Sequence, residues 1–288
     1  MSDASIIFEL RKADGSIRTV EDPRIVHHDG TWHMFYTLEG VDEDPACPAV
    51  HSGGAERVKQ GVRCLALATT RDITDRSAWT NHGALFPNVG GYQWSKSGAV
   101  AVRSGTPADP HMLIFGSWNI LTPDWVSPIY MPVAFSTDLI HWSMSPAFLM
   151  ERREGHPDAY VIEPGAPPLR LNDGNLLFVY NGAVECETYD PSYKRCYNVL
   201  WAVLDGKNPS VVVARADAAI LEPALAWEGH NSTIAATPNV VFVETLVPWP
   251  LGSGGGGGGD GGGGQRFRGW YGGGDMDVGA LEVEVARV

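Results

Sequence analysis

The sequence predicts an all-β protein with the architecture of a β-propeller. Short apolar or alternating runs bounded by Gly, Pro, Asn and Asp recur throughout the 288 residues, whereas a helical period of about 3.6 residues is hard to find. A unit of several strands also repeats, and the aspartates that close its third element, Asp72, Asp138 and Asp205, are 66 and 67 residues apart. One small sheet cannot bury both faces, so repeated sheets have to pack against neighbours, as propeller blades do. A β-sandwich with coincidental spacing is the alternative, but it leaves the recurring order of elements unexplained.

Each repeat has an inner strand with a polar start, then a turn and a strand with an aromatic pattern, then a strand followed by an aspartate. The four copies begin with EDPRIVHHDGTWHMFYT, WSKSGAVAVRSGTPADPHMLIFGSW, IEPGAPPLRLNDGNLLFVYNG and TPNVVFVETLV. They continue with LALATTRDITDRSAW, MPVAFSTDLIHW, NVLWAVLDGKNPS and GWYGGGDMDVGALEVEV. The offset from turn to tyrosine is the same in two copies, from Asp29 to Tyr36 and from Asp173 to Tyr180. We expect each copy to form one blade.

Two segments depart from the repeat. Before the first inner strand the chain offers SIIFELRKADGSIRT, which is enough for one outer strand of a preceding blade, so we expect the N-terminal blade to be incomplete. The glycine run at 252–264 cannot bury apolar surface and predicts a disordered loop inside the last blade. No G-K-[ST] follows it, so a nucleotide site is not indicated. We expect a single propeller domain over 1–288.

Charge and cysteine content limit the class of protein. The formal net charge of −13 argues against nucleic acid or an anionic membrane surface as a partner. The start has no signal-peptide pattern, and no apolar run approaches the roughly 20 residues that span a bilayer. We therefore expect a cytoplasmic protein with free thiols. A bridge between Cys186 and Cys196 becomes plausible only for an exported protein, and neither these nor Cys47 and Cys64 have zinc-site spacing.

Polar residues stand where a propeller brings its blades together. The inner strands line the central channel, so the residues that start them converge on its axis. These positions hold an acid, a base, a second acid and an amide, which suits a polar ligand better than packing. The residues are Glu21, Asp22, Pro23 and Arg24 in the first unit, Ser95 and Lys96 in the second, Glu163 and Pro164 in the third, and Pro238 and Asn239 in the fourth.

Two of these carboxylates fit the cleavage of a glycoside. The leaving oxygen needs a proton, and inversion needs a second group that activates water or orients phosphate on the other face of the sugar. Asp22 and Glu163 are two units apart, so they are expected to face each other at the inverting separation of roughly 6.5–9.5 Å. The aromatic side chains of Trp94, Trp118 and Tyr271 can stack on sugar faces, although each taken alone is more often a packing residue.

Five segments, in order, resemble glycoside hydrolase family 130, the β-mannoside phosphorylases and β-mannosidases. They are EDPRIVHHDGTWHMFYT, MPVAFSTDLIHW, IEPGAPPLRLNDGNLLFVYNGA, ILEPALAWE with PNVVFV, and WYGGGDMDVGAL. The resemblance implies a five-bladed propeller. It also implies that Asp22 is the general acid, that Arg24 lies among the sugar- or phosphate-binding groups, that Lys96 donates hydrogen bonds to substrate, and that Asp275 binds the sugar.

The chain departs from this family at two phosphate-binding positions. Asn181 stands where the phosphorylases usually have a histidine, and Gly116 where they have an arginine. These changes shift the expected reaction from phosphorolysis toward hydrolysis, with Glu163 as the base and Asn181 still among the substrate-binding residues. No cofactor or metal is expected, and inorganic phosphate is a co-substrate only for a phosphorylase.

Alternative interpretations stay open. Asp22 can form an Asx turn or pair with Arg24, Glu163 can cap a turn, and Asp275 can be a turn residue in GGGDMD. The whole protein can be a glycan-binding propeller without turnover, or, less in keeping with convergent carboxylates, a scaffold for protein partners. The expected partner is an oligosaccharide, and a homo-oligomer is compatible with the sequence.

Overall fold

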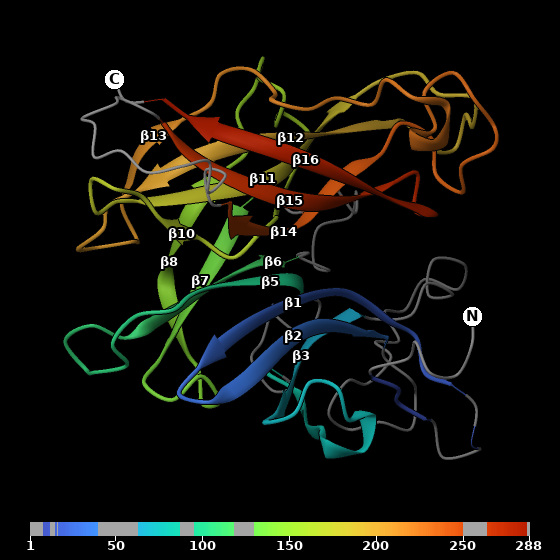
Figure 1. The fold of residues 1–288 in the computed structure, drawn as a ribbon. Helices are drawn as coiled ribbons and strands as arrows, with labels where there is room; N and C mark the ends of the chain where they lie inside the picture. The colour runs from blue at the N-terminus through green and yellow to red at the C-terminus, as the bar shows by residue number, and fades with distance from the viewer. Residues whose placement is uncertain are drawn as a thin grey trace, which may run out of the picture. The chain divides into compact units, whose positions relative to one another are not determined.

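The computed structural model confirms the all-β prediction (Figure 1). It forms two compact units, unit 1 (Met1–Glu151) and unit 2 (Arg152–Val288). Apart from two short 3-10 turns, the regular structure of the described residues consists of β-strands. The structure describes residues 8–11, 15, 17–39, 63–86, 95–117, 130–249 and 264–286. All but the last residue of the predicted glycine loop, together with Trp94, Trp118 and Cys47, lie outside this part of the chain.

Unit 1 contains two four-stranded antiparallel sheets, ordered β1-β2-β3-β4 and β5-β6-β7-β8. Sequential strands therefore pair with their neighbours along the chain, as in the blade of a propeller. The bounds are β1 Val20–His28, β2 Thr31–Glu39, β3 Arg63–Thr70, β4 Thr80–Ala84, β5 Ser95–Ala101, β6 His111–Ser117, β7 Tyr130–Ser136 and β8 Ser143–Glu151, with the 3-10 turn Arg76–Ala78 before β4.

Unit 2 contains the third and fourth sheets. In the third, β11 pairs with β12 on one side and with both β9 and β10 on the other, so two short strands share one edge of the sheet. The fourth sheet has the order β14-β15-β16. The bounds are β9 Val161–Pro164, β10 Leu169–Arg170, β11 Leu176–Glu185, β12 Arg195–Leu204, β13 Val212–Arg215, β14 Val241–Pro248, β15 Gln265–Gly273 and β16 Asp277–Val285, with the 3-10 turn Ala226–Glu228 before β14.

The prediction of five blades is wrong for the described residues, which form four blade-like sheets. The N-terminal residues among them make a single β-bridge, between Arg11 and Ile17, and no sheet. The Phe8 ring instead packs edge-on against Tyr36 and Trp79, with centroids 5.2 and 5.6 Å apart. An apolar segment this short buries more surface by covering the first sheet than it would as an isolated strand.

Aspartates form the turns that the repeat predicts. Asp29 and Gly30, with φ of 47° and 72°, make the two-residue turn between β1 and β2. Asp72, Asp138 and Asp205 each accept the backbone N–H two residues further along, at 2.8 to 2.9 Å. The structural role predicted for these three aspartates is confirmed.

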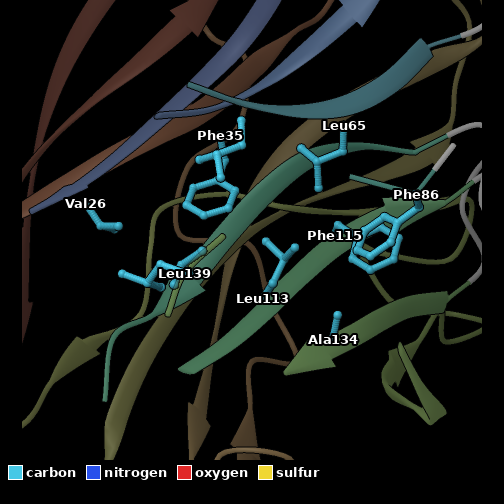
Figure 2. Packing of buried hydrophobic residues seen from close by; sticks show 10 residues of the cluster. Val26, Phe35, Leu65, Phe86, Leu113, Phe115, Ala134 and Leu139 are labelled. Atoms are coloured by element: carbon cyan, nitrogen blue, oxygen red, sulfur yellow. The ribbon is translucent and has the colours of Figure 1, made fainter. Parts of the chain in front are cut away.

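The core of unit 1 lies between its two sheets (Figure 2). Phe35 and Leu65 from the first sheet meet Leu113 and Phe115 from the second, and all four are buried. Gly98 permits this approach, because a Cβ added there would lie 2.8 Å from Leu65 Cδ1. A larger side chain at this position would separate the sheets.

A disulfide joins Cys186 and Cys196 at the loop end of the β11–β12 hairpin, with Cα atoms 5.8 Å apart. Cys64 is also disulfide-bonded. The prediction of free thiols is therefore wrong for these three residues. Sequence spacing could not show that pairing of β11 with β12 brings Cys186 and Cys196 within bonding distance.

Two structural features bear on the location of the protein. No helix among the described residues has the length and hydropathy needed to cross a membrane. Disulfides persist mainly in oxidising compartments. The bonded cysteines thus weigh against the cytoplasmic location expected from the sequence, which stays a prediction.

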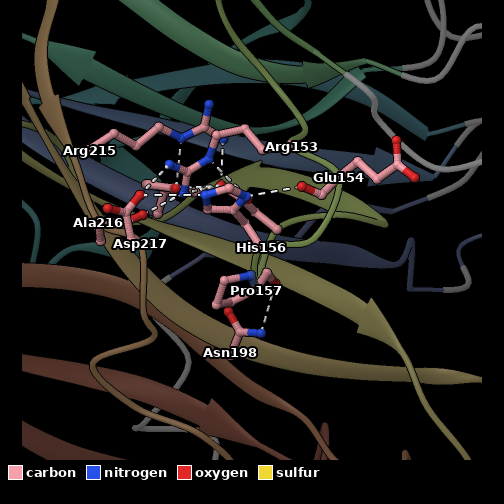
Figure 3. Close-up of polar contacts among 10 residues, drawn as sticks. Arg153, Glu154, His156, Pro157, Asn198, Arg215, Ala216 and Asp217 are labelled. Atoms are coloured by element: carbon pink, nitrogen blue, oxygen red, sulfur yellow. Dashed lines mark hydrogen bonds and ion pairs between the residues drawn. The ribbon is translucent and has the colours of Figure 1, made fainter.

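A buried ion network ties the start of unit 2 to strand β13 (Figure 3). The Asp158 carboxylate is fully buried and accepts bonds from Arg153 Nε and Nη2, both at 3.2 Å, from Arg215 Nη2 at 2.5 Å and from the Tyr180 hydroxyl at 2.7 Å. Arg153 also donates to the carbonyl of Ala216. One anion is thereby shared by two guanidinium groups, which fixes the segment that leads into β9.

A buried histidine in unit 1 lies where a positive charge is hard to accommodate. His111 is fully buried, its Nδ1 accepts the N–H of Arg103 at 3.0 Å, and its Nε2 has no partner in the described part of the chain. Burial, followed by the nearby His28 ring at 4.8 Å, lowers the pKa of His111. The titratable side chains around it are His28, His33, Asp109 and Asp138.

This geometry predicts a loss of stability in mild acid. The pKa of His111 in the folded chain lies below its ordinary value of 6.5, so the unfolded chain binds the proton first. The stabilisation is complete above about pH 6.5 and declines as the pH falls below that value. In urea titrations, His111→Asn, whose amide oxygen can accept the Arg103 N–H, should show a smaller decline than wild type. His230→Asn, an exposed site, is the control, and equal declines in wild type and His111→Asn would contradict the interpretation.

Candidate active site

The chain around Asp22 leaves the regular strand. The β1–β2 register shifts between Glu21 and Arg24, so Asp22 and Pro23 form a bulge. Asp22 has φ 52°, a left-handed conformation that residues other than glycine rarely adopt. Pro23 has no N–H to give to the ladder, which suits a position outside the pairing. A strained, bulged residue of this kind is more common at functional positions than in ordinary strands.

The second inner strand has the same irregularity, and the two bulges meet. The β5–β6 register shifts between Lys96 and Ala99, and Ser97 has φ 56°. Lys96 Nζ lies 3.2 Å from Asp22 Oδ2, and the Ser97 hydroxyl donates to the same oxygen at 3.2 Å. Arg24, a buried side chain, donates from Nη1 to the backbone carbonyl of Asp22 at 2.7 Å. Unit 1 thus brings together three predicted site residues, Asp22, Arg24 and Lys96.

These neighbours determine the charge of Asp22. Burial alone raises the pKa of the carboxyl, but the Lys96 ammonium, the Arg24 guanidinium and the hydrogen bonds from Lys96 and Ser97 together hold it below its ordinary value. Asp22 is therefore ionised at neutral pH in the absence of a ligand. The cluster combines one carboxylate with two cations and a hydroxyl, a set of groups that can bind the hydroxyls of a sugar.

Glu163 lies in unit 2, in β9, with its side chain buried. Its Oε1 accepts the hydroxyl of Tyr197 at 2.8 Å. Ala183 pairs with both Val161 and Tyr197, and its small side chain leaves room for the tyrosine to reach across β11. Burial and then the Glu163 charge raise the pKa of Tyr197 well above its usual range, so this phenol stays a donor.

Asn181 holds two sheets of unit 2 together. Its amide oxygen accepts the N–H of Val243 at 2.8 Å, and its amide nitrogen donates to the carbonyls of Val243 at 3.1 Å and Pro164 at 3.3 Å. The side chain therefore pairs with β14 much as a backbone peptide does. It is fully buried, and substrate binding by Asn181 stays a prediction.

Tyr271 is also engaged within unit 2. Its hydroxyl donates to Glu228 Oε1 at 2.7 Å, and its ring stacks on Trp227 with centroids 5.7 Å apart. The other Glu228 oxygen accepts the N–H groups of Ala224 and Leu225 at 2.7 and 2.8 Å. Glu228 thus fixes the 3-10 turn and the tyrosine together.

Asp275 is a turn residue of unit 2. It is exposed at the turn between β15 and β16, has φ 56° and accepts a hydrogen bond from the Thr237 hydroxyl. Asn239, two residues after Thr237, has φ 53°, and its buried Oδ1 has no partner within the described residues. The exposed carboxylate of Asp275 can accept hydrogen bonds from sugar hydroxyls.

A family model described as β-1,4-mannooligosaccharide phosphorylase matches residues 3–256. The chain belongs to glycoside hydrolase family 130. A 1,2-β-oligomannan phosphorylase from Thermoanaerobacter sp. (strain X514) is 28% identical over 237 residues, which cover 80% of this chain and 61% of the relative. The chain thus spans less than two thirds of the length of that curated relative.

Solved structures share the fold of this family 130 chain. A β-1,2-mannobiose phosphorylase from Listeria innocua, in complex with β-1,2-mannobiose, matches with a TM-score of 0.63 and 19% identity, covering 92% of this chain and 58% of that one. A second structure was reported with the finding that the GH130 family of mannoside phosphorylases contains glycoside hydrolases that target β-1,2 mannosidic linkages in Candida mannan. It matches with a TM-score of 0.59 and 17% identity, covering 98% of this chain and 92% of that one.

The predicted site residues of this family 130 chain are divided between its units. Unit 1 holds Asp22, Arg24 and Lys96, and unit 2 holds Glu163, Asn181, Tyr271 and Asp275. The expected separation of Asp22 and Glu163 across a channel stays a prediction. Among the described residues no group of His, Cys, Asp or Glu side chains could hold a metal ion.

Sequence reasoning missed two residues that hold these groups in place. Ser97 follows Lys96 directly, and the only available signal was its place beside a predicted site residue in WSKSG. Glu228 ends the family-like segment ILEPALAWE, but no spacing linked it to Tyr271. Both act through contacts between distant segments, which strand periodicity does not reveal.

Proposed function

We propose that the protein is an inverting carbohydrate-active enzyme that cleaves β-mannosides in oligosaccharides, with Asp22 as the general acid. The observation that carries this proposal is the carboxylate of Asp22, held in a left-handed bulge and contacted by Lys96 and Ser97. Membership of family 130 supports the substrate class, because the family model and the relatives above carry the names of β-mannoside enzymes.

In the proposed reaction the bond between C1 and the glycosidic oxygen breaks while Asp22 gives its proton to that oxygen. Water or phosphate attacks C1 from the opposite face, which inverts its configuration. Asp22 has to gain this proton in the complex. A bound sugar excludes water from the site, and one of its hydroxyls can draw Lys96 away from Asp22. Both changes raise the pKa of the Asp22 carboxyl, so that it can hold a proton in the complex.

We propose hydrolysis, with Glu163 as the base, ahead of phosphorolysis. Asn181 replaces the usual histidine of the phosphorylases, and its amide is committed to backbone groups of Val243 and Pro164. Gly116 replaces an arginine and has no side chain to offer to phosphate. If phosphate does react, it is a co-substrate and no other cofactor is needed.

The second candidate function is a glycan-binding protein without turnover. The lowered pKa of Asp22 favours it, because an ionised carboxylate cannot donate a proton. Both candidates predict sugar binding, and only the enzyme predicts a product.

Incubation with β-1,2- and β-1,4-mannobiose, with and without inorganic phosphate, separates these functions. Hydrolysis predicts that free mannose is released at the same rate with and without phosphate. Because the reaction inverts the configuration of C1, NMR should detect α-mannose as the first anomer. Formation of mannose 1-phosphate, only when phosphate is present, would show that the reaction is phosphorolysis and not hydrolysis. Binding of either disaccharide without formation of any product would contradict the proposed enzymatic activity and support the glycan-binding function.

A further inference from the structure

Arg195 lies between two tyrosine rings at the start of β12. Its guanidinium carbon is 5.5 Å from the centroid of Tyr160 and 5.9 Å from that of Tyr193. The guanidinium also shares a hydrogen bond with the Tyr160 side chain. The residue is partly buried, so water compensates its charge only in part. The two ring faces hold the cation in place through cation–π attraction.

Among the residues that the structure describes, this arginine has no anionic partner. The cross-strand neighbour of Arg195 is Glu185, which is exposed and forms no ion pair with it. No other carboxylate within the described residues pairs with Arg195, whereas Arg153 and Arg215 both bind Asp158. A guanidinium has five N–H donors in a planar fork that matches a carboxylate or a phosphate.

The chain around Arg195 is fixed in place. Cys196 is bonded to Cys186 across the hairpin. Inside the loop, the Thr188 hydroxyl lies within hydrogen-bond distance of the carbonyl oxygens of Asp190, at 2.8 Å, and Tyr193, at 2.6 Å. A group held in this way loses little conformational freedom when it binds a ligand.

Arg195 shares a face of its sheet with Glu163. Residues 195 and 197 of β12 point to the same side, because side chains alternate along a strand. Tyr197 on that side donates to Glu163. Arg195 is therefore two residues along β12 from Tyr197, the donor to the proposed base.

We propose that Arg195, with Tyr160 and Tyr193, forms a subsite for an oxyanion carried by a sugar, a carboxylate or a phosphate group. The forked donors pair with the anion, and the tyrosine hydroxyls bind neighbouring sugar hydroxyls. The subsite extends the proposed function, since the ligand is taken to be a sugar bound beside Glu163, but it requires no catalysis. Free inorganic phosphate offers the same chemistry.

Calorimetric titration of the full chain tests this subsite with mannose, mannuronate, mannose 6-phosphate and inorganic phosphate. Mannuronate or mannose 6-phosphate should bind more tightly than mannose, and Arg195→Gln should weaken that binding about 10- to 100-fold while leaving mannose unchanged. Arg195→Lys should retain part of the affinity. Arg170→Gln, an exposed arginine of unit 2, is the matched control and should bind as wild type does.

The outcomes separate this subsite from the proposed function. Inorganic phosphate that binds alone, and is lost in Arg195→Gln, supports the oxyanion site with free phosphate as its ligand. Equal affinity for mannose and both anionic sugars, or anion affinity unchanged in a folded Arg195→Gln, overturns the subsite. Absence of mannobiose cleavage affects only the proposed function, because these titrations measure binding.

Discussion

Asp22→Asn is expected to slow cleavage of a β-mannoside by about 10²- to 10⁴-fold, the range of a lost general acid. Asparagine keeps the size and the left-handed tolerance of aspartate, so the bulge should persist. Its amide cannot give a proton to the leaving oxygen. The turnover rate on mannobiose measures this effect, and the substrate affinity should change much less than the rate.

A control variant and a stability measurement accompany Asp22→Asn. Asp29→Asn changes an exposed aspartate in the same sheet, also with positive φ, and should leave turnover unchanged. Thermal unfolding of both variants checks that unit 1 is folded. A folded Asp22→Asn that retains more than a tenth of the wild-type rate would contradict the assignment.

Asp158→Ala is expected to lower the unfolding free energy by about 3–5 kcal/mol, because removing one partner leaves two guanidinium groups in a buried site without their anion. Arg153, Arg215 and Tyr180 each lose a hydrogen bond to the same carboxylate. Urea titration of the full chain measures the loss.

Asp217→Ala is the matched control for the buried network. Asp217 also pairs with Arg153, at 3.2 Å, but its side chain is 84% exposed. Exposed pairs contribute about 0–1 kcal/mol, so this change should be small. Similar losses in Asp158→Ala and Asp217→Ala would show that the buried network does not hold unit 2 together.

The sequence predicted the blades better than their number. Asp29-Gly30 identified a hairpin, and the spacing of Asp72, Asp138 and Asp205 identified equivalent turns, because both signals are local. The count of five came from the family resemblance, whereas the repeat itself has four units, and the short N-terminal segment packs on the first sheet. The disulfide was missed because the pairing of Cys186 with Cys196 depends on strand register.

The site was predicted in part. Equivalent starts of repeated strands correctly placed Lys96 beside Asp22. The sequence did not predict that both strands bulge there, so Ser97 was overlooked as a donor to Asp22. It also did not show that Asn181 is bonded to Val243, because that contact joins segments 62 residues apart.

The central claim is that Asp22 protonates the leaving oxygen, and the dependence of rate on the leaving group tests it most directly. Mannobiose needs that proton, whereas 2,4-dinitrophenyl β-mannoside has a leaving group that departs as a stable anion. Asp22→Asn should lose about 10²-fold or more on mannobiose and much less on the dinitrophenyl substrate. An equal loss on both substrates would contradict the account.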